Sequence, residues 1–175
     1  MRHALVAAWA GILAIAPASA IHAQQPGPAC PAGATTLPPE LGGWAARRPV
    51  RAAGNASGLG AATLVIGSAV DATLQPTGRV AYVIRPEKPG GSVSHGGLFS
   101  FRIERAGTYR VALGSGAWID ILRGRTMVAS TAHGHGPDCS GIRKMVDFPL
   151  TPGRYTLQIA ANATPDIALM VARLP

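Results

Sequence analysis

The feature that most constrains this chain is an alternation of apolar and polar side chains, repeated in short runs from Thr63 to the C-terminus. One run places Phe99, Phe101 and Ile103 at every second position, with polar residues between them. Successive side chains of a β-strand point to opposite faces, so each run predicts a strand with one apolar face. The predicted strands are residues 63–66, 72–74, 79–84, 98–104, 107–113, 117–123, 126–130, 143–148, 153–160 and 166–173.

Turn residues separate these runs, and they favour one arrangement of the strands. Arg105-Ala106-Gly107 and Thr151-Pro152-Gly153 each lie between two predicted strands, and glycine supplies the backbone freedom that hairpin turns need. Two longer loops are predicted at residues 87–97 and 132–141, and no window has the period of a core helix. The pattern predicts an all-β fold, an antiparallel β-sandwich formed as one domain by residues 63–175.

The segment before the sandwich differs in composition from the rest. Residues 24–62 are rich in Pro, Gly and Ala and contain few β-branched residues, which is typical of an extended arm. Leu41 and Trp44 are the large apolar residues expected to anchor this arm in the core.

The N-terminus has the pattern of a secretory signal peptide. Met1-Arg2-His3 is cationic, an apolar run extends from Ala4 to Ala16, and small residues follow. This order predicts a signal peptide at residues 1–23, cleaved after Ala20 or after Ala23. The apolar run is shorter than the roughly 20 residues that span a bilayer, so we expect no transmembrane segment and a periplasmic or secreted protein.

Basic residues outnumber acidic ones, and most of them are arginine. The chain carries 16 Lys+Arg and 8 Asp+Glu, a net charge of +8. The arginines are scattered through strand-like runs, and neither a basic run nor an RNA-binding aromatic motif is present. We therefore expect no nucleic-acid ligand, whereas attraction to anionic polysaccharide or lipid headgroups stays open.

The chain has two cysteines, Cys30 and Cys139. Oxidising compartments favour disulfides, so an exported chain with two cysteines predicts one bridge between them. The bridge would close a loop of about 110 residues and contribute about 4–5 kcal/mol in the chain-entropy description. A bridged Cys139 can be neither a nucleophile nor a metal ligand.

Two stretches resemble known families. The run from Phe99 to Leu113, with Trp118 to Leu122 and Leu150 to Ile159, resembles the bacterial pre-peptidase C-terminal type of β-sandwich, which implies an exported jelly-roll module. Separately, residues 116–121 with 132–148 are similar to small exported bacterial proteins often labelled homogentisate 1,2-dioxygenase. That likeness implies a metal-dependent oxygenase.

The densest group of reactive side chains is the loop from Ala132 to Gly141, which holds His133, His135 and Asp138. Histidines two residues apart on a strand share a face, and with His95 or Asp138 they form a candidate site for iron, zinc or copper. The alternative is that these histidines are exposed or make ordinary hydrogen bonds. No G-x-S-x-G motif is present, which disfavours a serine hydrolase.

Two side chains just after this loop are candidates for binding. Arg143 and Lys144 could receive an anionic ligand, and pairing with Asp147 is the alternative. Asp120 is expected on an outer face, paired with Arg123 or Arg143.

Two functional hypotheses follow. The first is an exported, non-catalytic module of the cell envelope that binds a glycan, a peptide or a partner protein. The second is a metal-dependent protein, a dioxygenase if the label holds, that uses His133 and His135. Whether the chain is an enzyme stays open.

Overall fold

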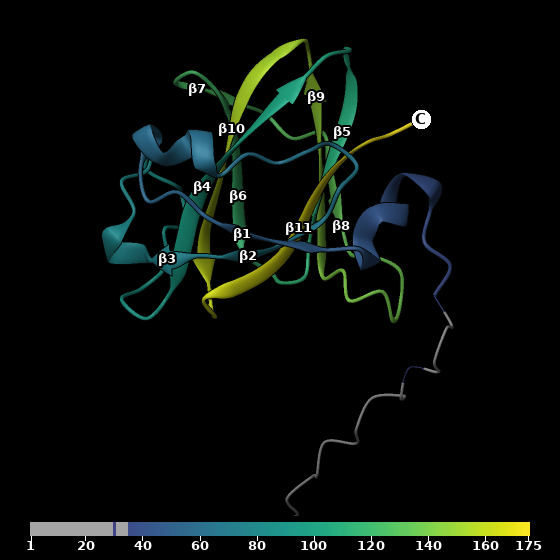
Figure 1. Ribbon diagram of the computed structural model, residues 1–175, viewed down its shortest axis with the longest axis horizontal. Helices are drawn as coiled ribbons and strands as arrows, with labels where there is room; N and C mark the ends of the chain where they lie inside the picture. The colour runs from purple at the N-terminus through teal and green to yellow at the C-terminus, as the bar shows by residue number, and fades with distance from the viewer. Residues whose placement is uncertain (1–29, 31–34) are drawn as a thin grey trace, which may run out of the picture. The chain divides into compact units, whose positions relative to one another are not determined.

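A computed structural model describes residue 30 and residues 35–175 (Figure 1). The chain divides into a unit of residues Met1–Pro31 and a unit of residues Ala32–Pro175, and the elements below belong to the second. The predicted signal peptide and the start of the arm lie outside the described residues. In the part that is described, no helix is long and apolar enough to cross a membrane.

Residues 35–175 form two β-sheets and three short 3-10 helices, with the following bounds. The helices are η1 (Pro39–Ala45), η2 (Ala56–Ala61) and η3 (Thr77–Arg79). One sheet has the strand order β1 (Arg48–Arg51), β2 (Val70–Thr73), β11 (Asp166–Arg173), β5 (Gly107–Leu113), β9 (Lys144–Leu150), β8 (Ala132–Gly134). The other has the order β3 (Gln75–Pro76), β4 (His95–Ile103), β10 (Gly153–Asn162), β6 (Trp118–Arg123), β7 (Thr126–Val128).

The connections between these strands are those of a jelly roll. Without the short strands β1, β3 and β8, the sheets read β2-β11-β5-β9 and β4-β10-β6-β7. Only the β6–β7 hairpin joins neighbours in one sheet, and every other connection among these eight strands crosses to the opposite sheet. The predicted antiparallel, jelly-roll-like sandwich is therefore confirmed.

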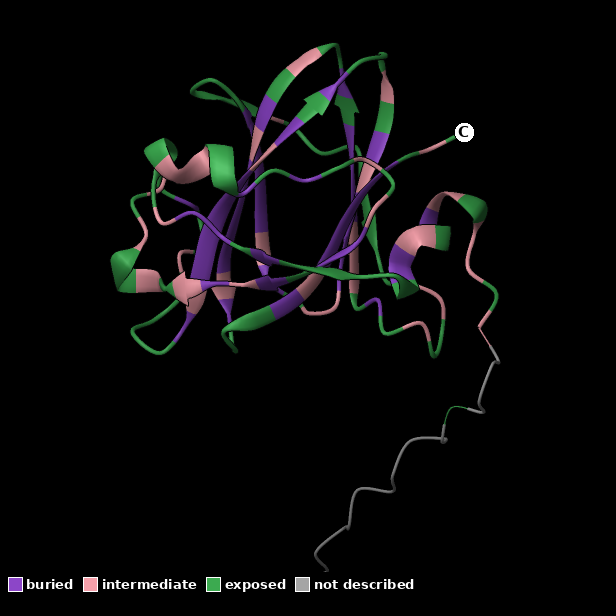
Figure 2. Ribbon diagram, in the orientation of Figure 1, coloured by how far each residue is buried: buried purple, intermediate pink, exposed green. Residues whose placement is uncertain are grey.

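The alternating residues form the core, as the sequence pattern predicts. Phe99, Phe101 and Leu157 are buried between the sheets, where Phe101 stacks on Tyr155 with ring centroids 5.6 Å apart. Figure 2 shows the buried residues concentrated along the long central strands. A second apolar cluster covers the outside of the first sheet, where Leu41 and Trp44 of η1 pack on Met170. The prediction that these two residues anchor the arm is confirmed.

An ion pair ties this second cluster to the sheet. Arg110 on β5 donates from Nε and Nη2 to the two carboxylate oxygens of Asp147 on β9, both at 2.8 Å. Glu40 of η1 approaches the same guanidinium at 3.7 Å. Asp147 therefore pairs with Arg110, and the predicted alternative, a pair with Arg143 or Lys144, is wrong.

Both cysteines are disulfide-bonded and neither is free. The disulfide predicted from the cysteine count is present. The structure thus agrees with an oxidising compartment, which is where such bonds persist.

Several predicted strands differ from the structure. β1 runs parallel to β2, so one pair departs from the antiparallel prediction. Residues 63–66 contribute only an isolated bridge from Thr63 to Ser100, and residues 80–84 form no strand. The short strands β1, β3 and β8 were not predicted. Each has four residues or fewer, which is too short for alternation to show.

Residues 80–94 instead cross the outer face of the second sheet. Hydrogen bonds between this segment and β10 hold it there. Gln158 on β10 accepts a hydrogen bond from Val83 N at 2.8 Å and donates to Ile84 O at 3.0 Å. Tyr82 donates its hydroxyl proton to Ile159 O at 3.2 Å. We call residues 80–94 the strap. It covers part of the sheet and positions the site described next.

Candidate functional site

The structure separates the histidines that were predicted to form a metal site. His133 is on β8 opposite Val146, whereas β8 ends at Gly134 and His135 lies beyond it. The Nδ1 atom of His135 is 2.9 Å from Arg143 O, and His135 lines a separate hollow of about 260 Å³ with Asp138 and Cys139. The shared face that two-residue spacing provides on a strand is therefore lost at the strand end.

The other two predicted ligands do not complete a site. His95 begins β4 in the opposite sheet, and its buried Nδ1 has no hydrogen-bond partner among the described residues. Asp138 is exposed, and its backbone oxygen accepts from Thr35 Oγ1 at 3.0 Å. Within residues 35–175 and at Cys30, no three His, Cys, Asp or Glu side chains are grouped to hold a metal ion. The metal site stays a prediction without support from the geometry.

A pocket lined by both lysines and by Asp120 lies at one edge of the sandwich. It has a volume of about 660 Å³ and opens where β6 and β7 of one sheet face β8 and β9 of the other. Its lining residues are Lys88, Trp118, Ile119, Asp120, Met127, Val128, Ala129, Ser130, His133, Lys144, Val146 and Phe148. We call it the lysine–tryptophan pocket. Apolar walls with a few charged groups are typical of ligand sites.

Both lysines of the chain lie at Trp118. The chain has only two lysines, and their Nζ atoms are 5.3 Å (Lys88) and 5.7 Å (Lys144) from the centroid of the Trp118 ring. An ammonium at this distance from an indole is attracted to the ring by a cation–π interaction. Lys144 also donates to Ala117 O at 2.8 Å, which fixes its position. Lys88 comes from the strap and is exposed, so the two cations reach the pocket from separate segments.

Asp120 lies beside these cations under the strap. Its carboxylate accepts from Trp118 Nε1 at 2.9 Å and from Gln158 Nε2 at 3.5 Å, and the residue is 5% exposed. Burial raises the pKa of this carboxyl, and the two hydrogen bonds oppose the rise. Asp120 is on the outer face, as predicted, but the predicted partner is wrong. Arg123 donates instead to Thr151 Oγ1 at 2.8 Å.

Burial also changes the acidity of Lys144. Loss of water around its ammonium lowers the pKa, and the positive charge of Lys88 lowers it further, while Asp120 acts in the opposite sense. Of the predicted anion-binding pair, Lys144 lines the lysine–tryptophan pocket. Arg143 is exposed and lines the small hollow beside His135.

Replacing Asp120 by asparagine is expected to change how stability depends on pH. Because the raised pKa means that the folded protein holds this proton more tightly, stability is lost as the pH rises from the ordinary pKa of the unfolded chain toward the raised folded-state pKa, and the loss is complete above it. The stability of Asp120→Asn relative to the parent should therefore rise between pH 4 and pH 7, while the loss of one of the two hydrogen bonds that the carboxylate accepts costs the variant the same at both pH values. Urea denaturation at both pH values measures this difference in stability. A difference that is independent of pH would contradict the assignment.

Sequence reasoning missed Lys88 and the role of Trp118. The one feature of the sequence that could have indicated these residues is composition, because the chain has only two lysines and many arginines. Nothing in the spacing shows that residues 88 and 144 meet.

Comparisons with known proteins identify no family for this chain. No family model matches the chain, and no curated protein matches it. Among solved structures, the chain is similar to a pre-peptidase C-terminal domain of a collagenase from Bacillus anthracis. The two are 14% identical over 71% of this chain and 95% of that domain, with a TM-score of 0.36. The domain is of the type that the strand pattern resembles, and the likeness to homogentisate 1,2-dioxygenase finds no support in these comparisons.

Proposed function

We propose that the protein is an exported, non-catalytic binding module, and that the lysine–tryptophan pocket takes the C-terminus of a peptide with an apolar last residue. The single observation that carries the proposal is the convergence of the two lysines of the chain beside an apolar pocket. Two ammonium groups suit a carboxylate, and Val128, Val146 and Phe148 offer apolar surface to the side chain next to it.

The strands at the pocket support a peptide over a glycan. β7 and β8 are the last strands of their sheets, so each presents one edge that is unpaired within the described sheets. An extended peptide can add its backbone to such an edge. A neutral glycan would be expected to stack on an open aromatic face, and both lysines lie over the Trp118 ring.

Short peptides ending in Leu, Val or Phe, each made as a free acid and as an amide, test the proposal by titration calorimetry. We expect the amide to bind at least about ten-fold more weakly, since a charge-assisted hydrogen bond contributes about 1.5–3 kcal/mol. Lys88→Gln and Lys144→Gln should each weaken binding of the acid by a similar factor. Equal binding of acid and amide would refute the proposal.

Two controls sharpen this test. Arg79→Gln removes one positive charge from an exposed position outside the pocket and should leave the affinity unchanged. Raising the pH should weaken binding of the acid, because the lowered pKa of Lys144 makes it lose its proton before an ordinary lysine does. If Arg79→Gln weakens peptide binding as much as Lys88→Gln does, the loss of affinity reflects net charge only.

A further inference from the structure

A second cationic surface lies on the outer face of β4 and β10, in a part of the sheet that the strap does not cover. Two hollows of about 750 Å³ and 430 Å³ share Thr63 and Arg102 as lining residues. The arginines that line them are Arg102, Arg105, Arg154 and Arg173, and we call this surface the arginine groove. Residues of η2 form one wall of the larger hollow, and Glu104 is the only acidic residue that lines either.

Two of these arginines are directly opposed without a partner. Arg102 on β4 and Arg154 on β10 are register partners, and both side chains are exposed. Like charges directly opposite each other on a sheet are destabilising. Neither guanidinium makes a hydrogen bond or an ion pair within the described part of the chain. Arg123 provides the contrast, since it is held by Thr151 Oγ1 and Pro152 O at 2.8 Å and 3.2 Å.

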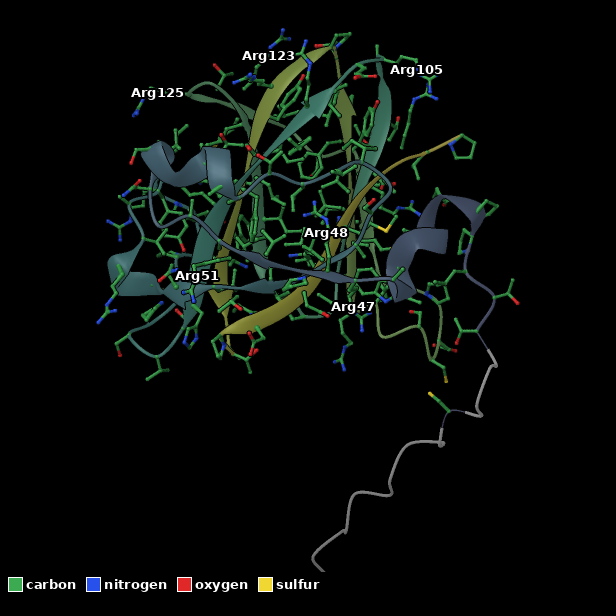
Figure 3. All side chains as sticks on the ribbon, viewed as in Figure 1. Arg47, Arg48, Arg51, Arg105, Arg123 and Arg125 are labelled. Carbon is green, nitrogen blue, oxygen red and sulfur yellow. The ribbon has the colours of Figure 1, made fainter. Side chains whose placement is uncertain are left out.

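Arginines nearby add to the positive charge. In Figure 3, Arg105, Arg123 and Arg125 lie toward the same end of the sandwich, whereas Arg47, Arg48 and Arg51 lie along another face. Arg47 is paired with Asp71 at 2.8 Å. None of the ion pairs among the described residues includes Arg102 or Arg154, so an anion placed between them would reduce their mutual repulsion.

The larger hollow of the groove carries hydroxyl groups, and no aromatic ring is open in it. Thr63 Oγ1 and Ser100 Oγ are 3.0 Å apart, Ser100 donates to Leu59 O at 2.9 Å, and Thr156 is the register partner of Ser100. The two aromatic residues of the larger hollow, Phe101 and Tyr155, are buried in the core. Single-stranded nucleic acid depends on exposed rings for stacking, and a flat bilayer does not enter a walled groove.

We propose that the arginine groove binds an acidic polysaccharide, with carboxylates of successive sugars held by Arg102 and Arg154 and sugar hydroxyls on Ser100, Thr156 and Thr63. A guanidinium presents a planar fork that matches a carboxylate, which an ammonium does not. The site is separate from the lysine–tryptophan pocket, with which it shares no lining residue. The inference therefore stands or falls independently of the peptide proposal.

Titration with an oligogalacturonate at low and at moderate salt tests the groove. Arg102→Gln with Arg154→Gln should weaken binding at least ten-fold and reduce its salt dependence, because exposed charges are screened by salt. The matched control is Arg51→Gln with Arg79→Gln, which removes the same charge from exposed positions outside the groove. The control should bind within two-fold of the parent. Equal losses in both variants would overturn the proposal in favour of attraction by net charge.

A second measurement uses the unaltered protein, so it does not depend on the folding of a variant. Bound oligogalacturonate should protect Arg102 and Arg154, but not Arg51, from modification by phenylglyoxal, as read by mass spectrometry. Lys88→Gln and Lys144→Gln should leave this protection intact. Protection of the same arginines by single-stranded DNA or anionic vesicles at equal charge concentration would overturn the assignment to a polysaccharide.

Discussion

Phe99→Ala is expected to destabilise the protein by about 3–5 kcal/mol. Phe99 is 0% exposed, lies on β4 opposite Leu157, and faces the core between the sheets. Truncation removes the transfer energy of the ring and leaves a cavity that the two sheets cannot close, since long strands on both sides hold them apart. The free energy of unfolding measured in urea should fall by this amount with an unchanged slope.

The control for this prediction is Val65→Ala. Val65 is 53% exposed, so its loss should change stability by no more than about 0.5 kcal/mol. A loss below 1 kcal/mol for Phe99→Ala would mean that the sandwich core does not have the packing described here.

Gln158→Leu is expected to cost about 2–4 kcal/mol, although leucine has a similar size. The Gln158 side chain is fully buried and bonds the strap through Val83 N and Ile84 O. Leucine can bond neither group, and each buried polar group left without a partner costs about 1–3 kcal/mol. The strap should then lift from the sheet, and the amides of Val83 and Ile84 should lose protection from hydrogen exchange.

Thr156→Val is the matched control, since Thr156 lies two residues away on the same outer face of β10. Its replacement should leave the exchange of the strap amides unchanged. If Gln158→Leu destabilises the protein but the strap stays protected, the strap is held by other contacts. Peptide binding should weaken in Gln158→Leu, because Lys88 is carried by the strap.

The core of this fold could be predicted from the sequence because alternation is a local property. Phe99, Phe101 and Ile103 belong to one strand, and their spacing alone assigns all three to one face. The disulfide was equally predictable, since a chain with two cysteines allows one internal pairing. Leu41 and Trp44 were recognisable as anchors because they are large apolar residues in a segment rich in Pro, Gly and Ala.

The candidate site could not be predicted in the same way, because it depends on contacts between distant segments. Lys88 and Lys144 meet at Trp118 only because the strap crosses the outer face of one sheet while β9, the neighbour of the edge strand β8, begins at Lys144 in the other. The strap was predicted in part as a strand at residues 79–84. Val80, Tyr82 and Val83 pack against the core, but the backbone at Val83 and Ile84 bonds to the Gln158 side chain rather than to a neighbouring strand.

The sequence by itself determined which residues form the core and that the chain folds as a β-sandwich, because period-two burial needs no knowledge of distant partners. Only the tertiary structure decided which charged and aromatic side chains lie close together. His133 and His135 are two residues apart in the sequence, but only His133 lies on β8. Arg102 and Arg154 are 52 residues apart in the sequence, and strand register brings them together. Spacing along one strand is fixed by covalent geometry, while register between strands is fixed by the packing of the whole sandwich.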